Sequence, residues 1–197
     1  GFEWEIPIKE GYREYKKSSF FRESFNNLQD YYTHPDCGGW EVSSPAFEEL
    51  KTAVSHAKSI IRRVEKLDWR KEGDCNHCGI HVHVSNRDED KSHNTGRLIS
   101  LVLNHSSSRR FLWAFSGRSD KNNWHRQAVS NCWDDKPSDY LGMNSVIPNS
   151  HGTMEFRIWS ANQENLIPAI EFSHSMAKFY RGKHYSIDKN RMKKLIS

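Results

Sequence analysis

Apolar and polar residues alternate in four short stretches of this chain, which is the pattern of a β-strand with one buried face. In each stretch one face is strongly apolar, and we expect helices to cover that face. The other face of each stretch carries ionisable side chains. The stretches are GFEWEIPI at 1–8, GGWEVS at 38–43, GIHVHVS at 79–85 and GTMEFRIW at 152–159.

Two segments have the spacing of amphipathic helices instead. The first follows the second strand, with Pro45 expected at its first helical position. The second is ENLIPAIEFSHSMAKFY at 164–180, for which we expect a kink at Pro168 and an end near Gly182. The apolar stripe of the first helix consists of Phe47, Leu50, Val54, Ile61, Val64 and Leu67.

The remaining segments are less regular. Residues 9–36 are polar and aromatic and give no clear element. Residues 97–115 predict a buried helix or a helix pair. The stretch from Arg118 to Asn149 is rich in Asn, Asp and Ser and predicts a long functional loop. Together the elements predict an α+β fold in which helices cover one face of a sheet.

The polar faces of the four strands share an unusual composition. A solvated sheet face is the simple interpretation, because antiparallel sheets often leave one face in water. Such a face usually mixes Thr, Lys and Arg, whereas here carboxylates dominate and lysine is absent. Gathered carboxylates repel one another unless cations lie between them, and oxygen ligands with histidine suit Mg²⁺. The set is Glu3, Glu5, Glu41, His81, His83, Glu155 and Arg157.

Two cysteines raise the alternative of a zinc site. Cys75 and Cys78 form a C-x-x-C pair just before His81 and His83, and all four are residue types that bind zinc. No second pair with compatible spacing follows, and Cys37 and Cys132 are isolated. We therefore favour Cys78 as a small buried residue and predict that the cysteines bind no structural metal.

Length and charge narrow the class of protein. The 197 residues suit one domain with a sizeable core. The net charge of +4 comes from residues 181–197, which hold six Lys or Arg and one Asp, whereas the other residues hold 23 basic and 24 acidic groups. With no long apolar stretch and no signal-peptide pattern, we expect a soluble cytoplasmic protein with reduced thiols and no membrane segment. The basic tail could contact a phosphate-rich partner such as nucleic acid.

The four strand motifs, in this order, resemble the putative amidoligase family. This family belongs to the glutamine synthetase and glutamate–cysteine ligase group of carboxylate–amine ligases, and its members occur in bacteria and in phages. The resemblance covers Gly1 to about Tyr180, which implies a catalytic domain at 1–180 followed by the basic tail at 181–197. It implies a curved, mostly antiparallel sheet, part of a barrel, with helices on its outer face, as in the glutamine synthetase catalytic domain.

The resemblance also implies a reaction and its site. The reaction uses ATP and Mg²⁺ to join a carboxylate substrate to an amine through an acyl-phosphate intermediate. His83 would lie nearer the nucleotide phosphates, Arg157 beside the substrate or phosphate, and Arg126, Lys136 and Asn144 in a loop facing the active site. His83, Arg126 and Arg157 would be the catalytic residues. The metal ligands implied by the motifs are Glu3, Glu5, Glu41, His81 and Glu155.

Two other functions remain open from the sequence. One is a zinc-dependent hydrolase that uses His81, His83 and a carboxylate around an activated water. The other is a non-catalytic nucleic-acid-binding module that uses the basic tail, although the near-neutral charge of the rest argues against a broad phosphate-binding face.

Overall fold

The fold described below is that of a computed structural model of the chain. Within the described residues, no helix combines the length and the apolar composition that a membrane crossing requires. The structure describes residues 1–9, 25, 31–36, 39–67, 78–85, 116, 146–148 and 153–180.

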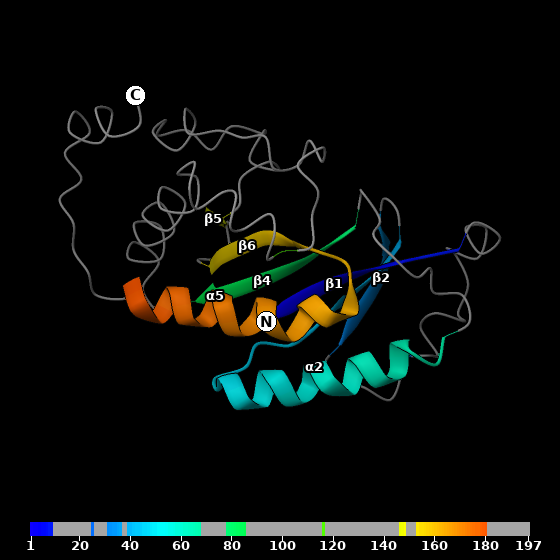
Figure 1. Cartoon of the computed structure of the whole chain (residues 1–197), viewed down its shortest axis with the longest axis horizontal. Coiled ribbons are helices and arrows are strands. Elements are labelled where there is room, and N and C mark those ends of the chain that lie inside the picture. The colour runs from blue at the N-terminus through cyan, green and yellow to red at the C-terminus, as the bar shows by residue number, and fades with distance from the viewer. Residues whose placement is uncertain are drawn as a thin grey trace, which may run out of the picture.

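The described strands form one open antiparallel sheet with the order β2-β3-β1-β4-β6-β5 (Figure 1). Within the described part of the chain two helices with defined bounds accompany the sheet, so the predicted α+β class with an antiparallel sheet is confirmed. The four strands predicted from alternation occupy adjacent central positions, β3-β1-β4-β6. The strands are β1 (Phe2–Pro7), β2 (Tyr32–Asp36), β3 (Gly39–Ser43), β4 (Gly79–Ser85), β5 (Val146–Pro148) and β6 (Thr153–Ser160).

Both helices lie side by side on the same face of the sheet (Figure 1). They are α2 (Leu50–Val64) and α5 (Leu166–Tyr180), and the short 3-10 helix η5 (Gln163–Asn165) leads into α5. The buried stripe of α2 contains Ala53 and Ala57, whose small side chains permit close approach to the strands. Burial of this apolar surface is the main force that holds the helices on the sheet.

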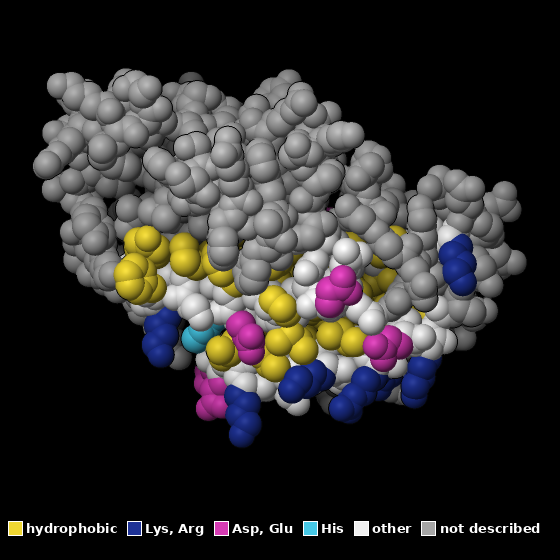
Figure 2. All heavy atoms as spheres, viewed as in Figure 1, with side chains coloured by type: hydrophobic (Ala, Val, Ile, Leu, Met, Phe, Trp, Pro, Cys, Tyr) yellow, Lys and Arg dark blue, Asp and Glu magenta, His cyan; other side chains and the backbone are white. Residues whose placement is uncertain are grey.

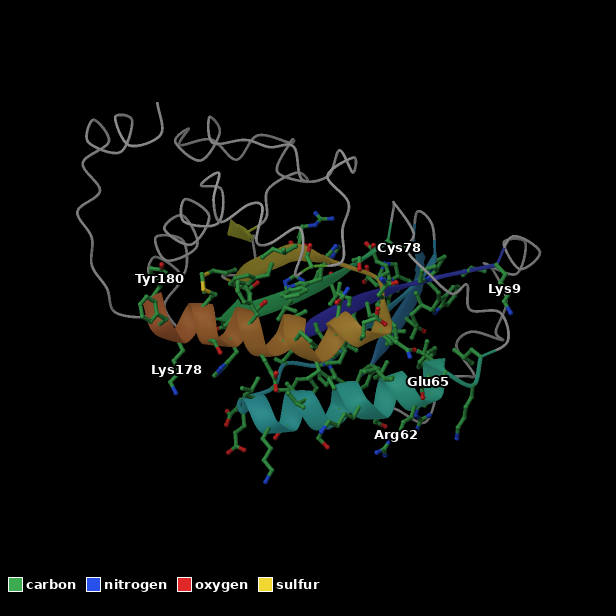
Figure 3. All side chains as sticks on the ribbon, viewed as in Figure 1. Lys9, Arg62, Glu65, Cys78, Lys178 and Tyr180 are labelled. Carbon is green, nitrogen blue, oxygen red and sulfur yellow. The ribbon has the colours of Figure 1, made fainter. Side chains whose placement is uncertain are left out.

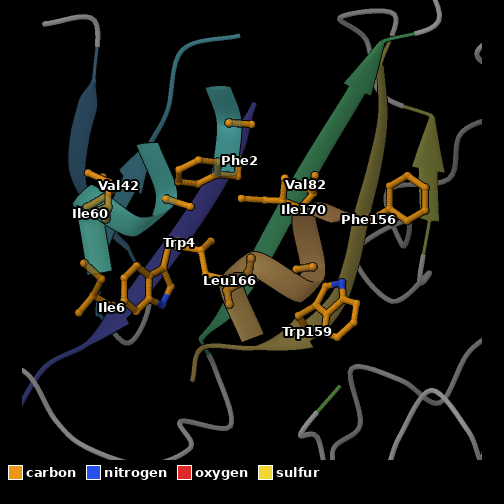
Figure 4. Close-up of a cluster of buried hydrophobic side chains, with 14 of the residues drawn as sticks. Phe2, Trp4, Ile6, Val42, Ile60, Val82, Phe156, Trp159, Leu166 and Ile170 are labelled. Carbon is orange, nitrogen blue, oxygen red and sulfur yellow. The ribbon is translucent and has the colours of Figure 1, made fainter. Parts of the chain in front are cut away.

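The hydrophobic core fills the layer between the helices and the sheet (Figure 4). Trp4 is fully buried there, and its indole Nε1 donates a hydrogen bond of 2.8 Å to the carbonyl of Ala161. This bond connects the central strand β1 to the turn before α5. The core side chains that Figure 4 labels are Phe2, Trp4, Ile6, Val42, Ile60, Val82, Phe156, Trp159, Leu166 and Ile170.

The outward side of α2 carries charged side chains, as the amphipathic pattern predicts (Figure 2). Arg62 points away from the sheet (Figure 3), whereas Glu65, just after the helix, accepts a hydrogen bond of 3.2 Å from Gln163 Nε2. The predicted start of this helix is wrong, however. Pro45 lies in the connection before the helix, and α2 begins at Leu50 after an extended Glu49. Ser44 and Pro45 therefore belong to the irregular connection between β3 and α2.

The prediction of a kink in α5 also needs correction. Pro168 is the third residue of α5, not an interior position. In the first turn the missing N–H has no intrahelical partner to lose, so proline is tolerated there. The described helix ends at Tyr180, and the predicted end near Gly182 lies outside the described residues.

Two strands were not predicted. Strand β2 lies in the segment that gave no clear element, and β5 lies within the stretch that was predicted as a loop, which is wrong for those three residues. The predicted helix or helix pair at 97–115, the rest of the predicted loop and the basic tail at 181–197 fall outside the described residues.

Candidate metal-binding and catalytic face

Side-chain alternation places a set of ionisable residues on the sheet face opposite the helices, which we call the polar face. On β1, for example, Phe2, Trp4 and Ile6 are buried under the helices, so Glu3 and Glu5 point to the other side. The ionisable residues of the polar face are Glu3, Glu5, His34, Glu41, His81, His83, Glu155 and Arg157.

Strand register brings these residues opposite one another. Glu3 stands opposite His81 on β4, and His83 stands opposite Glu155 on β6. Directly opposed residues of antiparallel strands have Cβ atoms only about 5 Å apart. The predicted residues of β1, β4 and β6 therefore meet at the centre of the face.

Glu3 is held between two histidines. Its Oε2 lies 3.3 Å from His81 Nδ1, and its Oε1 lies 3.2 Å from His83 Nε2. Burial would raise the pKa of Glu3, but the hydrogen bonds to both imidazoles and the attraction of their positive charge together outweigh burial and hold this pKa well below its usual range. The carboxyl group is therefore ionised and available as a ligand over the physiological pH range.

His81 is the most enclosed of the central groups. Its side chain is 8% exposed and has carboxylate oxygens on both sides of the ring. Nδ1 lies 3.5 Å from Glu155 Oε1 as well as near Glu3, and Nε2 lies 3.8 Å from Glu5 Oε1. Glu5 also accepts a hydrogen bond from the backbone N–H of Gly79 through its other oxygen. His81 thus connects the carboxylates of two strands.

The group of residues best suited to hold a single metal ion contains His83 rather than His81. Ligand atoms of Glu3, His83 and Glu155 all lie within 4.8 Å of one another. Two carboxylates and one imidazole form a donor set for a divalent cation. The resemblance implied His81 as the metal-side histidine and His83 as the one near the phosphates. In this geometry His83 belongs to the three-residue group, while His81 lies next to two of its members, Glu3 and Glu155.

A β-bulge in the pairing of β4 with β6 lies beside His81. Ile80 pairs with Trp159 while Val82 pairs with Phe156, so His81 stands opposite two residues of β6, Arg157 and Ile158. Bulges of this kind re-aim side chains and occur frequently beside active sites.

The bulge also changes the alternation of β6. Strict alternation would place Trp159 on the same face as Glu155. Instead Trp159 is fully buried against Phe172 of α5, with ring centroids 5.7 Å apart. Arg157 stays at the polar face, where its Nε lies 3.4 Å from Glu155 Oε1 and its side chain is 28% exposed. A partly exposed guanidinium beside the three-residue group can contact an anionic ligand.

A further carboxyl group of the polar face, that of Glu41, lies toward the edge strand β2. Glu41 accepts a 2.8 Å hydrogen bond from the Ser43 hydroxyl, and its Oε1 lies 3.6 Å from His34 Nδ1. Burial raises the pKa of Glu41; the Ser43 hydrogen bond opposes this rise and the nearby Glu3 carboxylate adds to it. His34 was missed by the sequence analysis, because its strand was not predicted.

The remaining predicted site residues, Arg126, Lys136 and Asn144, lie outside the described residues. Three of the four cysteines, Cys37, Cys75 and Cys132, lie outside them as well. Cys78 is buried immediately before β4, with its Sγ facing Gly39. The prediction that the cysteines bind no structural metal stays a prediction.

Comparisons with known proteins give no further guide: no family model, no curated protein and no solved structure matches this chain.

Proposed function

We propose that this protein is an ATP- and Mg²⁺-dependent carboxylate–amine ligase of the amidoligase type, with a sheet related to the glutamine synthetase catalytic domain. In this reaction the substrate carboxylate takes the γ-phosphoryl group of ATP and ADP leaves. The amine nitrogen then attacks the acyl carbon, phosphate departs, and the nitrogen loses a proton.

One observation carries the proposal: the three-residue group of Glu3, His83 and Glu155, drawn from β1, β4 and β6. Carboxylate oxygens are the ligands that Mg²⁺ prefers, and an imidazole can complete the set. The residues present therefore fit a divalent cation. A divalent cation held by these residues would neutralise phosphate charge during phosphoryl transfer.

A pair of opposed carboxyl groups next to the three-residue group supports the same function. Glu5 and Glu41 stand directly opposite one another, and both are largely buried. Two ionised carboxylates in this position repel unless a cation or a proton lies between them. A cation near Glu5, Glu41 and His81, either a second divalent ion or a cationic group of the substrate, would remove the repulsion.

Arg157 supplies the positive side chain that this chemistry needs. Its guanidinium lies next to Glu155 at the outer margin of the three-residue group. The planar fork of Arg can grip two anionic oxygens and stays charged at any working pH. Its role would be to orient the γ-phosphoryl group or the substrate carboxylate. Arg126, Lys136 and Asn144 are proposed to complete the nucleotide side.

A zinc-dependent hydrolase is the second candidate, because the same two carboxylates and His83 could hold Zn²⁺ with an activated water. Metal analysis of the purified protein separates the two functions. Stoichiometric zinc that resists dialysis supports the hydrolase. Binding of nucleotide that requires added Mg²⁺ supports the ligase.

Titration calorimetry with a non-hydrolysable ATP analogue tests the ligase proposal. We expect the analogue to bind in the presence of Mg²⁺ and to bind at least about tenfold more weakly without it or with Glu155→Gln, a typical effect of removing a metal ligand or its support. Glu171→Gln is the matched control, because Glu171 is exposed on α5, on the other side of the sheet. Equal binding with and without Mg²⁺, or an equal loss in both variants, would contradict the proposal.

A further inference from the structure

Two aromatic rings extend the polar face onto the edge strand β2. Tyr32 stands opposite Ser43 and His34 stands opposite Glu41, so both rings lie on the same side of the sheet as the carboxylates. The ring centroids are 5.3 Å apart with a 37° tilt. Tyr32 is 64% exposed, so most of its ring is open to a ligand.

Exposure of a single aromatic residue is ordinary in itself. Phe179 on α5 is exposed to a similar degree, 60%, but lies on the helix side of the sheet. Tyr32 differs from Phe179 in its neighbours, because it adjoins His34, which contacts the buried carboxyl group of Glu41. The neighbours of Tyr32, rather than its exposure, therefore make it a candidate ligand contact at the β2 end of the polar face.

Charge is distributed unevenly across the polar face. The sequences of β1, β2 and β3 contain no lysine or arginine, whereas β6 contributes Arg157. Anionic groups of a ligand are therefore favoured at the β6 end, and cationic groups are favoured at the β2 end, near Glu41. An aromatic ring adds to this preference, because the negative face of its π-system attracts cations.

We infer that Tyr32, His34 and Glu41 form a subsite for the cationic end of an elongated amine substrate, with the chemistry of a diamine or polyamine. The inference rests on the proposed ligase function and names the class of its amine. Tyr32 would hold the cation against its ring, Glu41 would attract it, and His34 would keep the Glu41 carboxylate and the Tyr32 ring in place.

Strand geometry sets the length of this substrate. Tyr32, Ser43 and Glu3 follow one another across β2, β3 and β1 in register. Two strand spacings separate Tyr32 from Glu3, a distance of about 10 Å. A substrate whose cationic end lies at Tyr32 must therefore extend about that far for its reacting amine to reach the three-residue group. A short monoamine cannot span the two places.

Calorimetric binding of spermidine to the full chain at moderate salt tests the subsite, with propylamine as the short probe. We expect spermidine to bind the wild type and Tyr32→Phe equally, since both keep the ring. Tyr32→Leu is expected to bind about 3- to 10-fold more weakly, because leucine is apolar but has no π-system. Phe179→Leu, the matched control, should bind as the wild type does, and propylamine should bind more weakly than spermidine.

Four outcomes would overturn the subsite: no binding of spermidine, unchanged affinity in Tyr32→Leu, an equal loss in Phe179→Leu, or propylamine as tight as spermidine. Nucleotide binding with Mg²⁺ is measured in the same variants and should not depend on Tyr32. If the wild type binds nucleotide but Tyr32→Leu binds spermidine normally, only the subsite fails. If the wild type binds no nucleotide, the ligase proposal fails, and a spermidine affinity that depends on the Tyr32 ring still supports the subsite.

Discussion

Glu5 of β1 stands directly opposite Glu41 of β3, and both residues are 7% exposed. Two opposed acidic residues at adjacent positions of a sheet are destabilising unless something offsets their charge. Ser43 and His34 contact Glu41, and Gly79 and His81 contact Glu5, so each carboxyl group has polar partners of its own. The pair is explained by a function that requires both carboxylates more readily than by stability.

Replacing Glu41 with Gln should stabilise the metal-free protein at neutral pH. Burial raises the pKa of Glu41, so the folded state binds its proton more tightly than the unfolded state does. Stability of the wild type is therefore lost as pH rises from about the usual value of 4.5 through the raised pKa. Gln removes this loss while keeping an oxygen to accept the Ser43 hydrogen bond.

We expect Glu41→Gln to exceed the wild type by about 1 kcal/mol at pH 7, the size of an ordinary point-substitution effect, and to show little or no gain at pH 4. Urea unfolding in the presence of chelator measures both values. The exposed Glu171→Gln serves as the control and should show no comparable dependence on pH. A Glu41→Gln variant that is less stable at pH 7 than at pH 4, relative to wild type, contradicts the account.

Gly39 should not tolerate a side chain. A Cβ at this position would overlap the backbone carbonyl of Ile6 on the neighbouring strand β1. Because the obstacle is backbone in the centre of the sheet, it cannot move aside without loss of strand pairing. We expect Gly39→Ala to lower the free energy of unfolding by about 2–4 kcal/mol, an overpacking effect at the upper end of the usual range. Ser55→Ala on the exposed side of α2 is the control, and an equally small effect of both substitutions would show that the strands have room here.

Arg157 should act on the reaction and not only on Glu155. Lysine keeps the charge at this position but loses the planar fork. We expect Arg157→Lys to fold normally and to bind Mg²⁺ and the ATP analogue within a few-fold of wild type. Its single-turnover release of phosphate from ATP should be slower by about 2–4 kcal/mol of activation free energy, as for the loss of one preorganised donor.

The competing explanation for Arg157 is a partly exposed ion pair with Glu155, 3.4 Å away. Such pairs contribute less than about 1 kcal/mol to stability. A phosphate-release rate in Arg157→Lys equal to that of the wild type would leave only this explanation.

The cysteines should be dispensable for folding. We expect the double substitution of Cys75 and Cys78 with Ser to change the free energy of unfolding by no more than about 1–2 kcal/mol, most of it from placing a hydroxyl at the buried Cys78. Chelator should not unfold the wild type. Cooperative unfolding on addition of chelator would instead reveal a structural zinc site.

The centre of the polar face could be predicted from the sequence because its strands alternate over the residues concerned. Glu3, Glu5, His81 and Glu155 each lie between residues that are buried under the helices. A period of two residues and a strongly apolar face fix which side each residue takes. Register was not predictable, because the pairing of Glu3 with His81 depends on contacts between strands 78 residues apart.

The β2 edge of the polar face could not be predicted, because the sequence of this strand does not alternate clearly. Pro35 interrupts the pattern of β2, since proline is rare in central strands and tolerated at edges. Tyr32 and His34 were therefore missed. The bulge opposite His81 was also missed, because its only trace in the sequence is the apolar Trp159 at a polar-face position of β6, and the pairing of Ile80 with Trp159 was not predictable.

The central claim is that the polar face holds a divalent cation between Glu3, His83 and Glu155, and anomalous scattering from Mn²⁺ tests it most directly. Crystals grown with Mn²⁺ and a non-hydrolysable ATP analogue would be measured above the manganese edge. We predict an anomalous peak within about 2.3 Å of carboxylate oxygens of Glu3 and Glu155 and of an imidazole nitrogen of His83, with a phosphate oxygen of the analogue as a further ligand. A well-ordered polar face without a manganese peak, or manganese bound only elsewhere on the protein, would contradict the claim.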